Sequence, residues 1–226
     1  MDSSAQADAC AIAYFAKLTC LQLPNYKHMG VAEKIVHSVV DYLEFEDSSQ
    51  EKHEYHDGYI VNISGGTLNH SRIGLNIGKS LDNALATGNC IPYNSELKVL
   101  AEKVNSYYYP DGLVICGEPE FDLNRKDIVK NPTLLVEVLS ESTENRGSDA
   151  FDRGGKFWNY RTIPSFREYV LISQDKPLVE SFYKNGSGIW QLAEAYGLES
   201  SIPLHSLGIE LKLADIFSRV IFEEEK

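Results

Sequence analysis

The sequence lacks any stretch of 18 apolar residues without a charge, so no membrane-spanning helix is predicted. Its apolar N-terminal segment, residues 9–23, contains Lys17, has no basic region before it and is followed by no small-residue cleavage site. These features argue against a secretory signal peptide. Residues 1–28 show no clear hydrophobic period, and we expect an N-terminal appendage there, followed by a single domain at 29–226.

Cysteine is scarce and scattered along the chain. The four cysteines, Cys10, Cys20, Cys90 and Cys116, include no C-x-x-C pair. This spacing argues against both a zinc cage and a disulfide framework. A reduced, cytoplasmic protein is therefore expected.

Positive charge is also in short supply. The chain has 21 Lys and Arg against 33 Asp and Glu, which gives a formal net charge of −12. Nucleic acid should repel such a chain overall, because neutralisation of phosphates supplies most non-specific affinity. A local basic cleft could still bind DNA, and Arg146, Arg153 and Arg161 are the candidates for one.

The remaining composition is that of a globular protein, and its hydrophobic pattern predicts a fold of mixed class. The pair Asp57–Gly58 predicts a hairpin turn. Residues 68–86 place Ile73, Ile77 and Leu81 four apart, which predicts a helix. Other helices are expected at 31–46, 145–161 and 211–218, and strands at 90–93, 96–100, 107–116, 133–139, 166–173 and within 178–195. This order indicates an α+β or mixed α/β arrangement.

Two carboxylates stand out because each lies in or beside an apolar run. Asp111 follows Pro110 at the start of one run, and Glu137 interrupts the run 134–139. Neighbouring carboxylates repel each other unless they share a cation, and Mg²⁺ is bound by a small number of such groups. Alternatively, Asp111 caps a turn after Pro110, and Glu137 pairs with an arginine.

Lys156 is the basic residue that could join these acids. Asp152, Lys156 and Tyr160 are spaced four apart, so they share one face of the predicted helix. From spacing alone, a solvated lysine paired with Asp152 is the more common arrangement.

Several segments between about 41 and 195 together resemble the Uma-two family of the PD-(D/E)XK nuclease superfamily. They are "DYLEFE", "HEYHDGYIVNISGGTLNHSRIGLNI", "YYYPDGLVIC", "NPTLLVEVLSEST" and "DRGGKFWNYRTIPSFREYVLIS". The resemblance implies a restriction-endonuclease-like core of αβββαβ order. Its mixed β-sheet would be flanked by helices, with an added N-terminal hairpin and C-terminal strands.

The same resemblance implies a metal-dependent catalytic site. Asp111 and Glu137 would bind Mg²⁺ or Mn²⁺ together with the backbone carbonyl of Val138. The lysine that the superfamily carries two residues after the second acid is replaced by Leu139, which implies that Lys156 supplies this function.

Two further residues are accessory candidates. His70 matches a histidine of the family and could border the cleft, or it could cap its helix. Glu54 could support the site, or it could pair with Lys52.

Two functions follow as hypotheses. The first is a Mg²⁺-dependent endonuclease that hydrolyses phosphodiester bonds of DNA. The alternative is a catalytically silent protein of the same fold that acts as a scaffold or partner-binding homo-oligomer, for example a homodimer. The net charge of −12 favours the alternative, whereas the intact set of two acids and a lysine favours the enzyme.

Overall fold

The structure is a computed structural model that describes residues 36–63, 65–139 and 151–222. The predicted appendage at 1–28 lies outside the described residues. Within the part of the chain that is described, no helix is long and apolar enough to cross a membrane.

The first helix, α1 (Val39–Ser48), begins later than the sequence predicted. The Ser38 side chain accepts a hydrogen bond from the backbone of Asp41, and the Asp41 carboxylate accepts one from the backbone of Ser38. This capping box fixes the start of the helix, so residues 36–38 are not helical. Tyr42 and Leu43 face the core of the first sheet.

The first six-stranded sheet contains the predicted hairpin. Its turn residues Asp57 and Gly58 both have positive φ, at 43° and 101°, which is the conformation that such a hairpin requires. The strand order is β2-β1-β5-β4-β8-β7. The strands are β1 (His53–His56), β2 (Tyr59–Asn62), β4 (Lys98–Ala101), β5 (Ser106–Tyr108), β7 (Phe121–Asp122) and β8 (Arg125–Val129), with a short 3₁₀ turn, η2 (Glu102–Val104), between β4 and β5.

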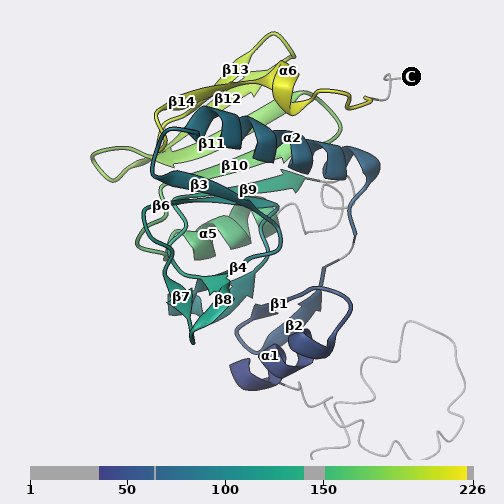
Figure 1. Cartoon of the computed structure of the whole chain (residues 1–226), viewed down its shortest axis with the longest axis vertical. Helices are drawn as coiled ribbons and strands as arrows, with labels where there is room; N and C mark the ends of the chain where they lie inside the picture. The colour runs from purple at the N-terminus through teal and green to yellow at the C-terminus, as the bar shows by residue number, and fades with distance from the viewer. Residues whose placement is uncertain (1–35, 64, 140–150, 223–226) are drawn as a thin grey trace, which may run out of the picture. The chain divides into compact units, whose positions relative to one another are not determined.

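The second six-stranded sheet, in the order β12-β11-β10-β9-β6-β3, is mixed, because β9 and β10 are parallel and the other neighbours are antiparallel (Figure 1). Its strands are β3 (Cys90–Asn94), β6 (Gly112–Cys116), β9 (Leu134–Leu139), β10 (Glu168–Ser173), β11 (Leu178–Lys184) and β12 (Trp190–Tyr196). A small hairpin, β13 (Ser201–Leu204) and β14 (Ile209–Lys212), and the short helix α6 (Leu213–Ile216) complete the fold.

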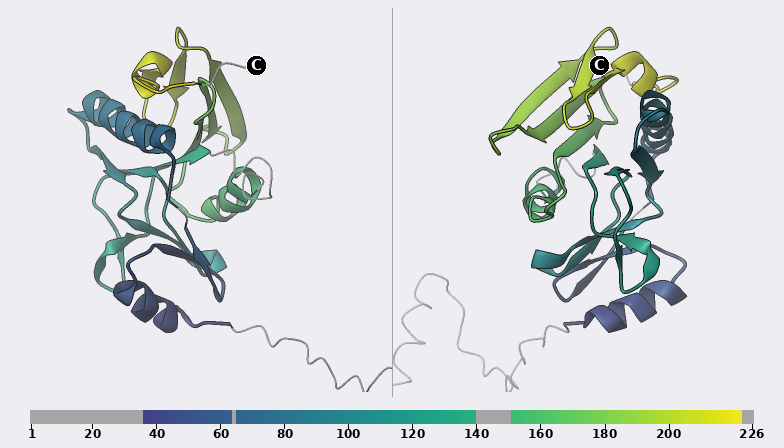
Figure 2. Two further views of the ribbon diagram at one scale, coloured as in Figure 1. Left: turned by 90° about the vertical axis from the view of Figure 1, so that its right-hand side faces the viewer. Right: turned by 60° about the vertical axis from the view of Figure 1, so that its left-hand side comes forward.

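Helices lie on opposite faces of the second sheet (Figure 2). The predicted long helix is confirmed as α2 (Leu68–Leu85), which packs Ile73, Ile77 and Leu81 against Val136 and other residues of one sheet face. The π-helical segment η3 (Phe151–Lys156) and the helix α5 (Phe157–Tyr160) replace the end of the helix predicted at 145–161. Tyr160 from α5 is buried with residues of the other face.

The strand predicted at 107–116 is wrong as a single element. It is divided into β5 and β6, which belong to different sheets. Pro110 lies between them, and a proline cannot donate to a strand ladder. The chain therefore leaves the first sheet at Tyr108 and enters the second at Gly112, with Asp111 just before the second sheet begins.

The expectation of free cysteines is wrong for one pair. Cys90 and Cys116 lie directly opposite each other on β3 and β6, and they form a disulfide. The two cysteines are 26 residues apart in sequence, which matches no disulfide motif. Their contact depends on how two distant strands pair.

Reduction of this disulfide should lower stability. A closed loop of 26 residues corresponds to about 3.5 kcal/mol by the chain-entropy model. We expect the melting temperature to fall by about 7–14 °C in a reductant, as measured by scanning calorimetry. The Cys90→Ser/Cys116→Ser variant should melt at this lower temperature with or without reductant, and a reductant-sensitive variant would contradict the assignment.

A network of charges connects the end of α1 to β8. Arg125 donates to both carboxylate oxygens of Asp47, at 2.6 and 2.7 Å, and lies 2.9 Å from Asp127. Asp127 also accepts a hydrogen bond of 2.7 Å from Lys98. The hydrogen bond from Arg125, supported by Lys98 and opposed by partial burial, lowers the pKa of Asp127 well below its ordinary value.

Asp127→Asn should therefore reduce stability in a pH-dependent way. The loss at pH 7 should be about 1 kcal/mol or less, because the Asp127 side chain is 40% exposed. A lowered folded-state pKa means that the ionised group stabilises the protein above the unfolded pKa of about 4, and that this contribution is lost as the pH falls further. In urea unfolding, the difference between the two proteins should shrink below about pH 4; a constant difference would contradict the assignment.

Candidate active site

The two predicted acids come from neighbouring strands. β6 and β9 are antiparallel, with Gly112 opposite Val136, so Asp111, immediately before β6, lies beside Glu137. The backbone N–H of Val138 donates a hydrogen bond of 2.7 Å to Asp111 Oδ2. This bond anchors the first acid to the strand that carries the second.

Glu137 is buried, with only 5% of its surface exposed. Side chains alternate along β9, so Glu137 faces the same side as Leu135 and Leu139, which is the side covered by α5. Its Oε1 accepts hydrogen bonds from the Tyr160 hydroxyl at 3.1 Å and from Lys156 at 3.3 Å. Burial raises the pKa of Glu137 well above its ordinary value, although Lys156 opposes this.

Lys156 is surrounded by carboxylates. Its Nζ lies 2.9 Å from Glu54, 3.3 Å from Glu137 and 3.4 Å from Asp152, and only 8% of the residue is exposed. Burial favours the neutral amine, but the three carboxylates outweigh it and raise the pKa of Lys156 well above its ordinary value. The solvated lysine suggested by spacing alone is therefore wrong.

The backbone around Lys156 is unusual as well. Lys156 ends the π-helical segment η3, a conformation that is rare and is found frequently at functional sites. Lys156 is 19 residues from Glu137 in sequence, and its amine nevertheless reaches the buried acid.

Glu54 lies on β1, so the first sheet also contributes a side chain to the site. Its Oε1 accepts the backbone N–H of Tyr109 at 3.2 Å in addition to Lys156, and its Oε2 lies 2.9 Å from His56 Nε2. Burial acts against ionisation, but Lys156 and His56 together lower the pKa of Glu54. The alternative partner, Lys52, pairs instead with Glu96 at 2.8 Å.

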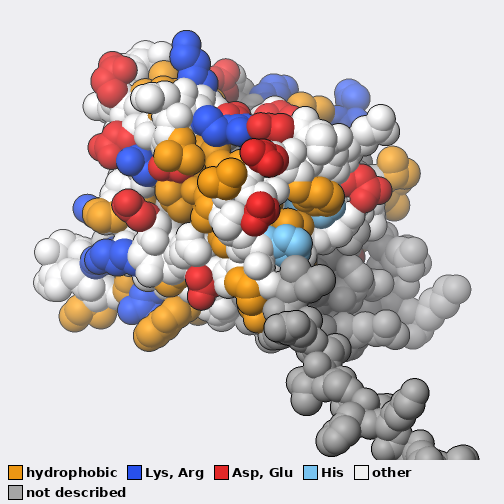
Figure 3. Space-filling view, turned by 90° about the horizontal axis from the view of Figure 1, so that it is seen from below, with side chains coloured by type: hydrophobic (Ala, Val, Ile, Leu, Met, Phe, Trp, Pro, Cys, Tyr) orange, Lys and Arg blue, Asp and Glu red, His pale blue; other side chains and the backbone are white. Residues whose placement is uncertain are grey.

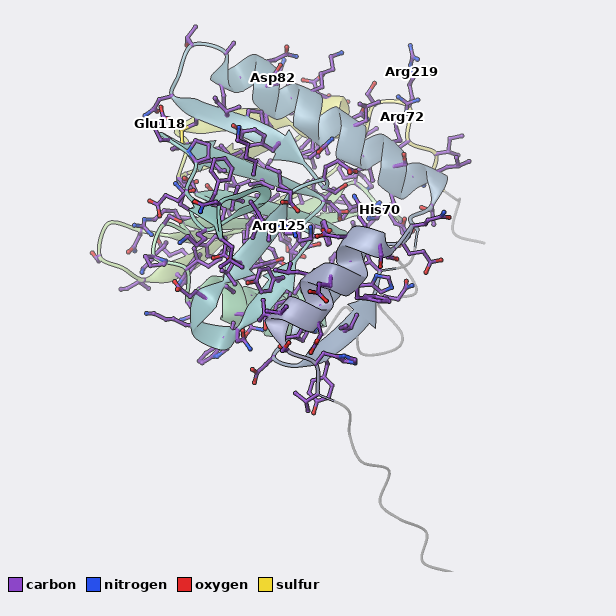
Figure 4. All side chains as sticks on the ribbon, turned by 60° about the horizontal axis from the view of Figure 1, so that its bottom comes forward. His70, Arg72, Asp82, Glu118, Arg125 and Arg219 are labelled. Carbon is purple, nitrogen blue, oxygen red and sulfur yellow. A yellow bond between two sulfur atoms is a disulfide. The ribbon has the colours of Figure 1, made fainter. Side chains whose placement is uncertain are left out.

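His70 lies in the first turn of α2 (Figure 4). Its Nε2 is 3.2 Å from Asp111 Oδ2. The hydrogen bond to Asp111 raises the pKa of His70, and partial burial opposes this. The helix cap is Thr67, whose side chain accepts the backbone N–H of His70, so the capping role considered for His70 is wrong.

The sequence alone assigned no role to three residues of this site. Asp152 and Tyr160 shared the helical face of Lys156, which was the available signal, and both now contact the buried charges. Tyr109 had no such signal. Its backbone contacts Glu54 and its hydroxyl donates to Glu46 at 2.8 Å, a contact between distant segments.

A groove opens beside Asp111 and runs along α2. Its volume is about 1290 Å³, and its lining includes His70, Lys52, Lys79 and Tyr109. On the face seen from below, acidic and basic side chains are interspersed over the described residues, and no large area has one sign (Figure 3). The groove is lined by the lysines Lys52 and Lys79 and by the acids Glu51, Asp82 and Asp111, so it offers no extended basic face.

Arg161, one of the basic residues expected near the cleft, does not line this groove. The guanidinium of Arg161 lies 5.2 Å from the ring of Trp158 and 5.7 Å from that of Trp190, in a cation–π arrangement. Arg146 and the side chain of Arg153 lie outside the described part of the structure.

The donor groups suit a hard divalent cation. Glu54, Glu137 and Asp152 surround a single lysine, and Asp111 adds a fourth carboxylate nearby, so the site has a surplus of negative charge. Among residues 36–63, 65–139 and 151–222, no three His, Cys, Asp or Glu side chains form a metal cage by themselves. Mg²⁺ is usually held by one or two carboxylates, with water and substrate oxygens completing its shell.

A mixed sheet between helices, with two acids on adjacent strands and a lysine against one of them, defines a restriction-endonuclease-like fold. A solved structure supports this class: a putative nuclease belonging to DUF820 from Anabaena variabilis ATCC 29413 superposes with a TM-score of 0.63. The match covers 80% of this chain and 98% of that one at 15% identity, which shows the fold.

The chain belongs to the Uma2 family, whose model, described as "Putative restriction endonuclease", matches residues 39–214. The resemblance drawn from sequence motifs is thereby confirmed. Two uncharacterised proteins of Synechocystis sp. (strain ATCC 27184 / PCC 6803 / Kazusa) are similar over most of their length. One is 35% identical over 182 residues, covering 80% of this chain and 92% of the relative; the other is 36% identical over 174 residues, covering 77% and 96%.

Proposed function

We propose that the protein is a divalent-metal-dependent endonuclease that hydrolyses phosphodiester bonds of DNA. The observation that supports the proposal is that Asp111 bonds to the backbone N–H of Val138, the residue after Glu137, while Lys156 contacts the Glu137 carboxylate. The family is described as putative restriction endonucleases and the structural relative as a putative nuclease, and both descriptions support the same class of reaction. Burying charges costs desolvation free energy, and well-packed hydrophobic residues can often replace them without loss of stability. Buried charges at this position therefore favour a functional role over a structural one.

In this proposal, Asp111, Glu137 and the backbone carbonyl of Val138 bind Mg²⁺ or Mn²⁺. Such an ion, when bound, lowers the pKa of a coordinated water and polarises a phosphoryl oxygen. The raised pKa of Glu137 is consistent with a buried acid that needs a cation in order to ionise fully.

Lys156 acts mainly as a cation in this mechanism. Three carboxylates hold its amine protonated, so its charge can stabilise the negative charge that develops on the phosphate. Glu54 keeps the amine in place from the first sheet, and Tyr160 orients Glu137 through its hydroxyl. A bound cation would lower the affinity of Lys156 for its proton, which would also allow the amine to accept a proton from water.

The groove beside Asp111 is the proposed path of the DNA, because Asp111 lines it and it is larger than the second cavity that Asp111 lines, which has a volume of about 380 Å³. Its volume of about 1290 Å³ exceeds that of ordinary small-molecule pockets, which are about 300–1,000 Å³. The proposal places the protein in the cytoplasm, where the Cys90–Cys116 disulfide would be an exception.

The test is nicking of supercoiled plasmid by the purified protein with Mg²⁺, with Mn²⁺ and with excess chelator. We expect nicked or linear DNA with either metal and none with chelator. Binding measured in parallel should weaken steeply as salt is added, since it depends on lysine–phosphate contacts.

The alternative is a silent scaffold protein, for which the net charge of −12 is the supporting observation. No cleavage with either metal, together with no DNA binding at low salt, would favour this alternative. If sedimentation under these conditions then detects a homodimer, the scaffold protein would be identified as a homo-oligomer.

A further inference from the structure

The loop before α2 approaches His70 unusually closely. A Cβ atom built on Gly66 would lie 2.6 Å from His70 Nδ1 and 2.8 Å from its Cγ. Gly66 does not have a positive φ, so its backbone conformation is open to alanine. A side chain at position 66 would therefore clash with the imidazole ring of His70, whereas the backbone conformation of Gly66 would permit one.

The surrounding backbone is held in place, so the ring is the part that would move if a side chain were added. The Thr67 hydroxyl donates to Gln174 Oε1 at 2.6 Å and accepts the backbone N–H of His70 at 3.1 Å. The Asn69 amide donates to the carbonyl of Ile221 at 2.8 Å. These bonds tie the first turn of α2 to Gln174, directly after β10, and to Ile221, whereas the His70 ring can turn about its own side-chain torsions if its contact with Asp111 is broken.

The other side of the ring holds the first acid. Asp111 Oδ2 lies 3.2 Å from His70 Nε2 and accepts the N–H of Val138 at 2.7 Å. Two donors at one oxygen, arriving from different elements, fix the rotation of the carboxylate. The second oxygen, Oδ1, is then the one presented to a cation. Partners that orient a metal-binding carboxylate typically change metal affinity or activity by about 10–100-fold when they are mutated.

We propose that Gly66 and His70 act as a positioning pair for Asp111, in which the missing side chain at Gly66 lets the imidazole lie where it orients the carboxylate. The proposal rests on the proposed metal-dependent function and assigns a role to a residue outside the catalytic set. His70 acts through Asp111, and Gly66 acts through His70.

The experiment is a double-mutant cycle in the full-length protein, with Mn²⁺ binding by calorimetry as the readout. Gly66→Ala and His70→Ala should each weaken Mn²⁺ binding by about tenfold, and the double variant should be no weaker than either, because both changes remove one contact. His70→Gln retains an N–H donor on a more flexible side chain, so this variant should keep most of the wild-type affinity for Mn²⁺. Adding Gly66→Ala to His70→Gln should then change the affinity little. The matched control is Gly65→Ala, since a Cβ at Gly65 meets nothing within 4 Å.

A second readout keeps this test separate from the proposed function. The ¹⁵N resonances of the His70 ring, measured by NMR, should shift in Gly66→Ala and stay in place in Gly65→Ala. If wild-type protein binds no Mn²⁺, the proposed function fails, and the ring resonances still decide the positioning. Unchanged ring resonances in Gly66→Ala, or a further loss of affinity when Gly66→Ala is added to His70→Ala, would overturn the proposal.

Discussion

Asp111→Asn should reduce the rate of metal-dependent DNA cleavage by at least about a hundredfold, which corresponds to about 2.7 kcal/mol of transition-state stabilisation. Asparagine has the same shape, and its carbonyl oxygen can still accept the N–H of Val138. It loses the negative charge that the proposed cation requires. The fold should therefore survive, with a free energy of unfolding within about 1 kcal/mol of wild type.

The matched control is Glu118→Gln, which changes the net charge of the protein by the same amount. Glu118 is exposed and follows β6 at its far end, away from Asp111 (Figure 4). Single-turnover cleavage of a labelled duplex should be unaffected in this variant. Wild-type rates in Asp111→Asn would remove Asp111 from the mechanism.

Lys156→Met should abolish cleavage and also destabilise the protein by about 3–5 kcal/mol. A solvated lysine, the arrangement that spacing alone favours, could be removed with little effect on folding. The structure corrects this, because the amine is buried among Glu54, Glu137 and Asp152. Its removal leaves three carboxylates without a cation, which is a large cost in a buried site.

Glu54→Gln provides the rescue experiment for this prediction. Adding it to Lys156→Met removes one uncompensated carboxylate, so part of the lost stability should return in denaturant unfolding. Cleavage should stay absent, since no cation is restored. If Lys156→Met is as stable as wild type, the buried charge cluster is wrongly assigned.

Local signals in the sequence predicted several elements of the fold. The turn at Asp57–Gly58 depends on the backbone preferences of two residues, and α2 depends on a stripe of apolar residues within one segment. The sequence could not predict that Tyr108 and Gly112 belong to different sheets, because that division depends on distant pairing partners. The hairpin β13–β14 was also not predicted.

The site shows the same division between local and distant information. Asp111 and Glu137 were recognisable because carboxylates interrupt apolar runs, and Lys156 came from the resemblance to a family. The contact of Glu54 with Lys156 joins β1 to the distant segment η3, so no spacing along the chain could reveal it. The disulfide between Cys90 and Cys116 escaped prediction because it depends on the pairing of β3 with β6.

The most direct test of the metal centre is anomalous diffraction from crystals soaked in Mn²⁺. We predict one strong peak between Asp111 and Glu137, within about 2.3 Å of an oxygen from each carboxylate and of the Val138 carbonyl. The peak should be absent from crystals of Asp111→Asn. A peak at other residues, or none at all in crystals of a protein that cleaves DNA, would contradict the assignment of these acids as the metal site.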